Sequence, residues 1–437
     1  MHLLLKIGRA RGELILCCSR YLLYAILTIK AGSKIPKKRS VMLHPILLVI
    51  GSHRESIKLL PVYLACLSEN LPVAIAASSQ NDTLLRATFD LFNITPDFDI
   101  GMLPLHNLFT TTQMVLEHMH TILTNIQPSL VMVQGDTTTA MAASLAAFYH
   151  RTPIAHIEAG LRTNDLSSPF PEEMNRRFMS LIASYHFTPT AATAAHVLAQ
   201  GVHRDAVFCV GNTIVDALRI LQSKIGAGQI AVDEKIQRII TNAQHKGHTV
   251  ALLTMHRHMT YPEGLERVLQ SIKQALQKHN NLTVIYMYQY NHDAYGNSEH
   301  VHIQNTIERS HLKQCDRMHF YESISYPDIV YALSASDWIM TDSDELQEAA
   351  TSLGKPSLIL RDKTERMESV WAGISSVVGT DVHKILHGIT MLINDIPLTT
   401  KYRELYGDGH AAEKILTILL QKFTHVFDVA TEHKRVD

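Results

Sequence analysis

Residues 129–136 read SLVMVQGD, and residues 137–150 read TTTAMAASLAAFYH. The first stretch is a short, continuous apolar run, which is typical of a strand that helices cover on both faces. The second stretch begins with threonines that can cap a helix, and its alanines permit close packing against a sheet. Together they predict one strand–turn–helix unit of a parallel α/β sheet.

Strand candidates of the same kind recur from Pro45 onward and alternate with helical patterns, as expected of βαβ units. The other expected strands are 45–52, 71–78, 153–158, 206–210, 249–256, 282–288, 338–343 and 356–361. A second well-patterned helix is expected at 263–279, where apolar residues recur at helical spacing. The sequence therefore predicts the α/β fold class, with Rossmann-like, doubly wound parallel sheets.

The length of 437 residues exceeds what one hydrophobic core usually supports, so we expect two domains that face a cleft. A polar, weakly patterned stretch from Gly226 to Gly247 separates two series of strand–helix units, and the junction is placed there. The expected N-terminal domain is 42–225, the C-terminal domain is 226–407, and a last helix and tail occupy 408–437. The sequence leaves open whether this last helix crosses back onto the first domain.

Residues 1–41 differ in charge from the rest of the chain. They carry nine basic residues and one acidic residue, a net charge of +8, whereas the remaining chain is −9. Their apolar run from Tyr21 to Ile29 is shorter than the roughly 20 residues that a spanning helix needs, so no transmembrane segment is predicted. Two interpretations stay open: a basic amphipathic arm that touches anionic lipid, or a stretch upstream of a true start at Met42, which we favour.

Composition excludes several classes of protein. A net charge of −1 gives no basic field of the kind that nucleic-acid binding needs, so no nucleic-acid partner is expected. The five cysteines are an odd number without C-x-x-C spacing, which argues against a disulfide framework or a zinc ribbon and favours a reducing cytoplasm. The 26 histidines include no H-E-x-x-H motif, so no metal site is predicted.

Three carboxylates stand where strands end or helices begin in the expected N-terminal domain. Asp136 ends the strand at 129–136, and Glu158 ends the next one within HIEAGLRT. Glu172 follows two prolines in PFPEEMNRR and falls in the first turn of a helix. Each carboxylate alone could cap a helix or lie at the surface. Clustered carboxylates can supply both an acid and a base, so the three together predict an active site.

The expected C-terminal domain supplies polar groups at the equivalent edge of its sheet. The strand at 249–256 ends in His256, which Arg257 and His258 follow. These groups would suit a diphosphate that lies opposite the carboxylates. Thr-Asp-Ser at 341–343 closes another strand of the same series.

In order and wording, these segments resemble the non-hydrolysing UDP-N-acetylglucosamine 2-epimerases from about Leu43 to Leu420. The further matching stretches are GSHRESIK at 51–58, GDTT at 135–138, VGNTIVDAL at 210–218, SLGKP at 352–356 and RDKTER at 361–366. The resemblance implies a glycosyltransferase-B type architecture, a UDP-sugar substrate, a homodimer and no cofactor. In line with this, no G-x-G-x-x-G motif for a nicotinamide nucleotide follows the first strand.

The implied reaction interconverts UDP-N-acetylglucosamine and UDP-N-acetylmannosamine. UDP leaves C1 as the C2 proton is removed, and UDP is added back after a proton returns on the other face of the glycal. The family's acid/base carboxylates match Asp136, Glu158 and Glu172, and its phosphate-contacting histidine matches His256.

The resemblance also implies a set of substrate-binding residues. Glu55 and Lys58 match positions of the family's first loop, Ser343 matches a phosphate contact, and Arg366 matches a residue near the sugar nucleotide. His53 stands where the family has an arginine, and Arg54 next to it could substitute.

The departures from the family pattern gather in the nucleotide half. Asp344-Glu345 replaces Gly-Gly, and each carboxylate would cost on the order of 4 kcal/mol at about 4 Å from a diphosphate. The family's ribose-binding carboxylate falls on Ala349, and its aromatic residue near uracil falls on Ile329. The other altered positions are Gln289, in place of a histidine, and Asn81, in the family's allosteric Gln-His pair.

Three functional hypotheses follow: an active UDP-N-acetylglucosamine 2-epimerase, which we favour; a relative that acts on another nucleotide sugar or hydrolyses it; and a non-catalytic homologue that binds sugar nucleotides. A glycosyltransferase is the least favoured, because it does not need three carboxylates around C2.

Overall fold

The first of the two sheets is built around the apolar run SLVMVQ at residues 129–134. The computed structural model describes residues 44–78, 83–101, 103, 107–255, 263–288, 297–322, 325–394 and 402–432. The strand β4 (Leu130–Gln134) is buried along its whole length and lies between β1 (Ile46–Ile50) and β5 (Ile154–Ile157). The sheet is parallel, with the order β3-β2-β1-β4-β5-β6-β7. Its other strands are β2 (Val73–Ala77), β3 (Phe98–Asp99), β6 (Tyr185–Thr188) and β7 (Val207–Cys209).

Helices cover both faces of this sheet, which explains why its strands are continuous apolar runs. Ile46 and Leu48 of β1 point into one hydrophobic cluster, and Leu47 and Val49 point into another on the opposite face. The helices on the first face are α2 (His53–Ser68), α3 (Thr83–Phe92), α8 (Thr213–Gly226) and α17 (Ala411–Glu432). The helices on the second face are α4 (Leu108–Ile126), α5 (Thr138–Tyr149) and α6 (Glu172–Ile182). A further helix, α7 (Ala191–Ala199), packs beside β6 and β7.

The second sheet repeats this arrangement with the order β10-β9-β8-β11-β12-β13, again with parallel pairing. Its strands are β8 (Thr249–Thr254), β9 (Leu282–Tyr288), β10 (Met318–Glu322), β11 (Trp338–Thr341), β12 (Ser357–Ile359) and β13 (Ser375–Val377). The helices on one face are α10 (Glu263–Lys278), α12 (Asn297–Ser310) and α16 (Val382–Asn394). The helices on the other are α9 (Glu234–His245), α13 (Tyr326–Ala335) and α14 (Asp344–Ser352), and the short α15 (Met367–Trp371) packs on β13.

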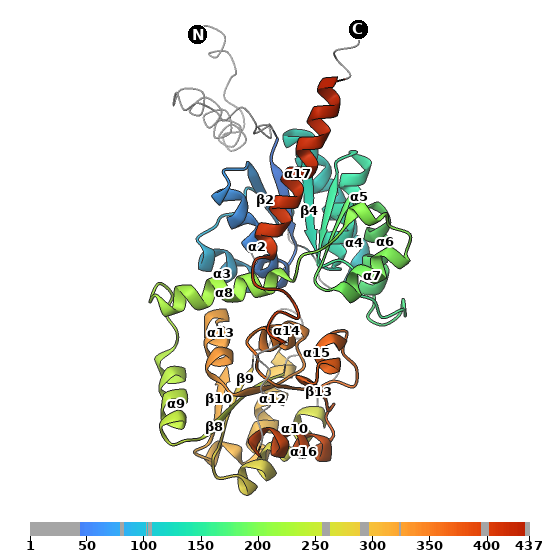
Figure 1. The fold of residues 1–437 in the computed structure, drawn as a ribbon. Helices are drawn as coiled ribbons and strands as arrows, with labels where there is room; N and C mark the ends of the chain where they lie inside the picture. Colours follow the sequence, from blue (N-terminus) through green and yellow to red (C-terminus); the bar gives the residue numbers. More distant parts are fainter. Residues whose placement is uncertain are drawn as a thin grey trace.

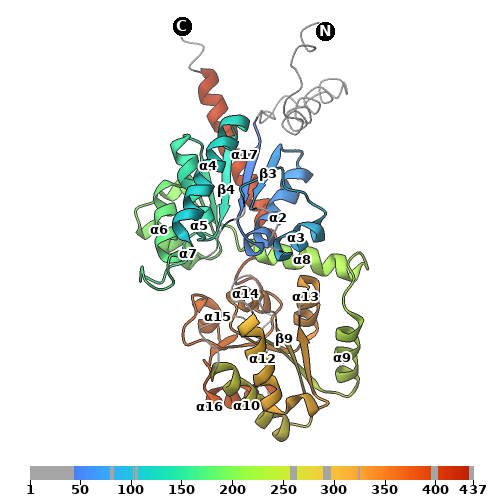
Figure 2. The same cartoon turned by 180° about the vertical axis from the view of Figure 1, so that it is seen from behind.

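Both sheets have a topological switch point where neighbouring strands lead to helices on opposite faces. In the first sheet this point lies between β1 and β4, and in the second it lies between β8 and β11. Ligands of doubly wound folds bind beyond the carboxyl ends of the strands at such a point. In Figures 1 and 2 the two domains are stacked, and α14 and α15 stand on the side of the second domain that faces the first.

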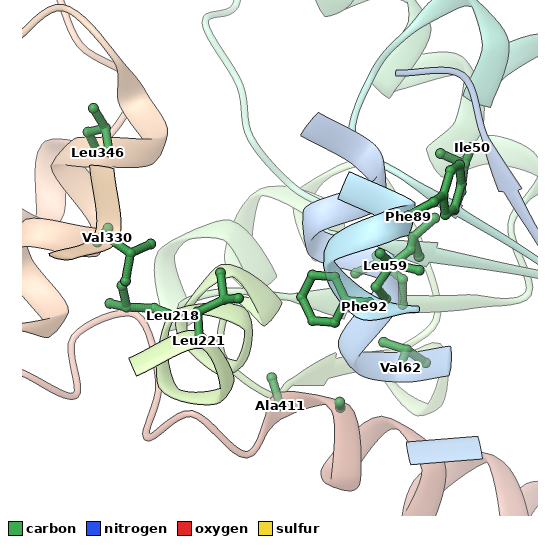
Figure 3. Packing of buried hydrophobic residues seen from close by; sticks show 14 of the residues in the cluster. Ile50, Leu59, Val62, Phe89, Phe92, Leu218, Leu221, Val330, Leu346 and Ala411 are labelled. Atoms are coloured by element: carbon green, nitrogen blue, oxygen red, sulfur yellow. The ribbon is translucent and has the colours of Figure 1, made fainter. Parts of the chain in front are cut away.

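Two helices join the domains. Helix α8 runs along the junction, and Leu218 and Leu221 lie between the side chains of α2 and α3 on one side and Val330 and Leu346 on the other (Figure 3). Helix α17 begins near the junction and extends along the first domain (Figure 1), where it packs on α2 and α8. The chain therefore crosses back onto the first domain at its end, the possibility that the sequence had left open.

The predicted fold class, two Rossmann-like parallel sheets, is confirmed, and the expected strands and helices occur within a few residues of their predicted bounds. The polar stretch from Gly226 to Gly247 was expected as a weakly patterned junction, but it contains α9. Asp233 caps this helix and only a narrow stripe that includes Ile236 and Ile240 is buried, so the helix looks polar in sequence. In the described part of the chain, no helix is long and apolar enough to span a bilayer.

Candidate active site

A pocket of about 250 Å³ lies between the domains, beyond the carboxyl ends of the central strands. Its walls combine acidic and basic side chains from both halves of the protein. The charged residues that line it are Arg54, Glu55, Lys58, Asp136, Glu158, Glu172, Arg176, Asp342, Asp344, Glu345, Glu365 and Arg366. The arrangement suits a ligand that carries negative charge and that reacts through proton transfer.

The turn after β4 presents Asp136 to the pocket. Gly135 has φ of +74°, a conformation that favours glycine, and the Thr137 side chain caps α5 directly afterwards. The Asp136 carboxylate forms an ion pair with Arg176, with 2.7 Å between Oδ2 and Nη2. Asn175 Nδ2 donates to the Asp136 carbonyl at 2.9 Å, so both the backbone and the side chain of Asp136 are held by α6.

Glu158, at the end of β5, is the most heavily bonded of the three carboxylates. It is only 6% exposed and has φ of +62°, a strained conformation for a residue with a side chain. Oε2 accepts from Lys58 Nζ at 2.6 Å and from Gln134 Nε2. Burial opposes the charge, but Lys58 and Arg366 outweigh burial, so the pKa of Glu158 lies below its ordinary value.

Glu172 occupies the first turn of α6, as the two preceding prolines predicted. Its Oε2 atom is buried and has no hydrogen-bond partner among the described residues. Burial first, and then repulsion by Asp136, raises the pKa of Glu172, although Arg176 acts in the opposite direction. A carboxyl group in this environment keeps its proton to higher pH than an exposed glutamate does.

The start of α2 carries two buried charged residues. Ser52 caps the helix, which directs Glu55 back toward the loop, where it accepts from Gly51 N at 2.7 Å and from Thr137 Oγ1 at 2.5 Å. Burial raises the pKa of Glu55 to about 7 despite these hydrogen bonds. One turn later Lys58 reaches the pocket, where burial disfavours its charge, but Glu158 outweighs burial and raises the pKa of the ammonium group.

The second domain closes the pocket with the N-terminus of α14. Ser343 caps this helix, and Asp344 and Glu345 form its first turn. Asp344 forms an ion pair with Arg361, and Oε1 of Glu345 lies 3.9 Å from Lys58 Nζ. Because both carboxylates have cationic partners, their repulsion of a diphosphate is smaller than that expected of isolated charges.

Arg366 lines the pocket beside Glu158, and Glu348 holds Arg366 from outside the pocket lining. Arg366 Nη2 donates to Glu158 Oε1 at 3.2 Å, and its Nε donates to Glu348. Asn212, the N-cap of α8, donates from Nδ2 to Glu158 at 2.9 Å and to Glu348 at 2.7 Å. With Lys58 and Gln134, four side chains from separate parts of the chain therefore donate to Glu158.

The pocket brings together eight of the ten residues singled out from the sequence. These are Arg54, Glu55, Lys58, Asp136, Glu158, Glu172, Ser343 and Arg366. His53 begins α2 next to the pocket but does not line it. His256 and its neighbours Arg257 and His258 lie outside the described residues, as do Asn81 and Gln289.

Sequence reasoning missed several polar residues of the site. Arg176 and Asn212 lie within matching stretches, PFPEEMNRR and VGNTIVDAL, and could have been selected there. Glu348 carries no such signal, because it differs from an ordinary helical glutamate only in what surrounds it. Across the described part of the chain, no group of three or more histidine, cysteine or acidic side chains is arranged to hold a metal ion.

Comparison with known proteins places this site in a family. The sequence model of the UDP-N-acetylglucosamine 2-epimerase family matches residues 66–420. The UDP-N-acetylglucosamine 2-epimerase of Yersinia pestis is 35% identical over 382 residues, which cover 86% of this chain and 98% of that protein. The corresponding protein of Escherichia coli K12 is 33% identical over 383 residues, covering 86% and 98%.

Solved structures agree with this assignment. The UDP-GlcNAc 2-epimerase of Neisseria meningitidis, bound to UDP-GlcNAc, has a TM-score of 0.75 and 33% identity over 86% of this chain and all of that one. The enzyme of Methanocaldococcus jannaschii, in complex with UDP-GlcNAc and UDP, has a TM-score of 0.70 and 27% identity over 86% and 99%. The shared two-domain architecture is of the glycosyltransferase-B type. By its sequence and its fold, the chain belongs to the UDP-N-acetylglucosamine 2-epimerase family.

Proposed function

We propose that this protein interconverts UDP-N-acetylglucosamine and UDP-N-acetylmannosamine by the non-hydrolysing route. A base removes the C2 proton while the bond between C1 and the diphosphate oxygen breaks, which leaves a double bond between C1 and C2. An acid then returns a proton to the other face of C2, and the diphosphate oxygen of UDP adds back to C1. The overall reaction consumes no water and no oxidant.

The observation that carries the proposal is the meeting of Asp136, Glu158 and Glu172 with cationic side chains in one interdomain pocket. Proton removal from C2 needs a base and proton return on the opposite face needs an acid, so the reaction requires carboxyl groups in different protonation states. A departing diphosphate also needs positive charge, which Lys58 and Arg366 supply at the same pocket.

The environments of the three carboxylates favour different roles. Glu172 has a raised pKa and an unbonded, buried oxygen, so it is suited to donate a proton. Asp136, which forms an ion pair with Arg176 of α6, is suited to accept one. Glu158 stays ionised and fully bonded, so it holds Lys58 and Arg366 in place and stabilises the positive field that the diphosphate enters.

A second candidate function is the same type of reaction on another nucleotide sugar. The observation that favours it is the first turn of α14, where Asp344 and Glu345 line the pocket and engage Arg361 and Lys58. Thermal unfolding in the presence of UDP and of other nucleoside diphosphates would separate the two candidates, because only a bound nucleotide raises the melting temperature.

The test of the proposal is a product analysis of purified protein incubated with UDP-N-acetylglucosamine. We expect UDP-N-acetylmannosamine to appear until a stable mixture is reached, with UDP still attached to the sugar. Free UDP and free N-acetylmannosamine in equal amounts would instead identify a hydrolysing enzyme. No change in the substrate, with UDP still bound by the protein, would support a non-catalytic homologue.

The homodimer and the cytoplasmic location expected from the sequence stay predictions. Large apolar side chains exposed on α5 and α6 support the homodimer.

A further inference from the structure

Glu348 is buried at the boundary between the domains, although it lies outside the matching sequence stretches at 341–343 and 352–356. It lies on α14 of the second domain and is 1% exposed. Both of its carboxylate oxygens are engaged: Oε1 accepts from Arg366 Nε, and Oε2 accepts from Asn212 Nδ2 at 2.7 Å. Burial of a carboxylate is unfavourable because the charge loses its hydration. The hydrogen bonds from Arg366 and Asn212 offset this desolvation.

The orientation of the Asn212 amide is fixed by its role as a helix cap. Its Oδ1 accepts from the backbone N–H of Ile214 at 3.1 Å, which leaves Nδ2 as the atom that faces the carboxylates. Nδ2 then donates both to Glu348 and, at 2.9 Å, to Glu158 Oε1. One amide group therefore bridges carboxylates of the two domains.

Arg366 bridges the same two carboxylates. Its Nε donates to Glu348, and its Nη2 donates to Glu158 Oε1 at 3.2 Å. Its Nη1 is buried and has no hydrogen-bond partner among the described residues, although Glu365 Oε2 lies 3.6 Å away. Because Arg366 lines the pocket, its guanidinium group is placed to attract an anionic group of the substrate.

These contacts lead to an inference that rests on the proposed epimerase function. We propose that Glu348 is a positioning residue for the reaction, which holds Arg366 and Asn212 against Glu158 so that the guanidinium group of Arg366 is fixed in the pocket for the diphosphate. Glu348 does not itself line the pocket. It acts on the substrate through Arg366.

The charges around Glu348 make this positioning depend on pH. Lys58 of α2, Glu158 after β5, Arg366 and Tyr406 face it from other parts of the fold, and Glu345 lies on its own helix. Burial, opposed by Arg366 and reinforced by Glu158, raises the pKa of Glu348 to about 7. A protonated Glu348 carries an O–H donor that meets another donor, Arg366 Nε or Asn212 Nδ2, so one of its two hydrogen bonds is lost. Positioning is therefore complete above about pH 7 and weakens as the pH falls through that value.

The test compares two glutamate-to-glutamine variants of the full chain. In Glu348→Gln, the new NH₂ group also faces a donor whichever way the amide is turned, so one contact must break. The matched control is Glu368→Gln, which alters another carboxylate that crosses between the domains. Its partner is the Thr190 hydroxyl, at 2.7 Å, which can donate or accept and so tolerates the amide.

The measurements are the dissociation constant for UDP and the pH profile of kcat/KM between pH 5.5 and 9. We expect Glu348→Gln to weaken UDP binding at least tenfold and to abolish the acid-side fall of activity that the wild type shows near pH 7. Glu368→Gln should stay within threefold of the wild type and keep its pH profile.

Two results would overturn the positioning role. One is a Glu348→Gln protein that binds UDP within threefold of the wild type; the other is one that keeps the wild-type pH profile. Failure of the proposed function gives a different pattern, in which the wild type does not convert UDP-N-acetylglucosamine at all. In that case the UDP-binding comparison still decides whether Glu348 positions Arg366.

Discussion

Among single residues, two of the carboxylates that the sequence singled out, Glu158 and Glu172, differ in the direction in which their pKa values are shifted. Glu158 is held ionised by Lys58 and Arg366, whereas Glu172 has a raised pKa and a buried oxygen without a hydrogen-bond partner among the described residues. Pairs of titratable groups whose pKa values are pushed apart commonly mark the acid and base of an active site. Glu172 is therefore the residue at which the acid/base assignment is best tested.

We expect Glu172→Gln to slow turnover by about 10²- to 10⁴-fold, because an amide of the same shape cannot deliver a proton. UDP should still bind with nearly unchanged affinity, since Lys58 and Arg366 are untouched. Steady-state kinetics and isothermal titration with UDP measure the two quantities. Turnover equal to the wild type would remove Glu172 from the mechanism.

Sequence motifs predicted the residues that project from strand ends and helix starts, such as Asp136, Glu158 and Glu172, because those positions are fixed locally. They did not predict Glu348, whose role depends on two partners that are 136 and 18 residues away along the chain. The contact with Asn212 exists only after both domains have folded and met.

At the scale of elements, the altered first turn of α14 is the main difference from the family pattern. A helix N-terminus with open N–H groups favours a phosphate, and Gly-Gly lets a phosphate approach closely. Here Glu345 instead lies near Lys58, and Asp344 pairs with Arg361. The two carboxylates therefore place negative charge beside cations of the pocket region and reduce the attraction that a diphosphate would meet.

Replacing Asp344-Glu345 by Gly-Gly should strengthen UDP binding at least tenfold, equivalent to about 1.4 kcal/mol, because two negative charges that repel the diphosphate are removed. Glu345→Gly alone should give most of the gain, and Asp344→Gly, which releases Arg361, serves as the matched comparison. Titration calorimetry with UDP gives the affinities. A weaker affinity in the double variant would mean that both side chains are parts of the native site and that UDP is not its ligand.

The elements that the sequence missed are short or lie at edges. The strands β3 and β13 have two and three residues at the ends of their sheets, and β10, at another edge, is only partly buried. The strand β6 lies inside its sheet, between β5 and β7. Its four residues include Tyr185 and His186, so the sequence shows no apolar run that would predict a strand there. Tertiary pairing, and not local pattern, defines these strands.

At the scale of the whole molecule, one surface of the first domain remains apolar. Phe148, Tyr149 and Leu181, at the C-terminal ends of the neighbouring helices α5 and α6, are 51%, 70% and 74% exposed. Figures 1 and 2 both show α5 and α6 side by side on the outside of the first domain. Exposed apolar patches of this kind commonly mark protein interfaces.

If two copies associate through this surface, Tyr149→Glu combined with Leu181→Glu should convert the dimer to a monomer, because each copy would place charges in an apolar contact. Met391→Glu, at a residue of α16 that is 54% exposed, is the control and should leave the mass unchanged. Light scattering coupled to size-exclusion chromatography measures the mass. A double variant with the mass of the wild-type dimer would show that the interface lies elsewhere.

The proposed reaction requires the pocket between the two sheets to remove and return the proton at C2 while UDP leaves and re-adds. The most direct test is incubation of the protein with UDP-N-acetylglucosamine in D₂O, followed by NMR of the recovered sugar nucleotides. We predict deuterium at C2 of both epimers, with UDP still attached, and no deuterium at C2 in a parallel incubation with Glu172→Gln over the same time. Recovery of sugar nucleotides without deuterium at C2, from a wild-type protein that binds UDP-N-acetylglucosamine, would contradict the account.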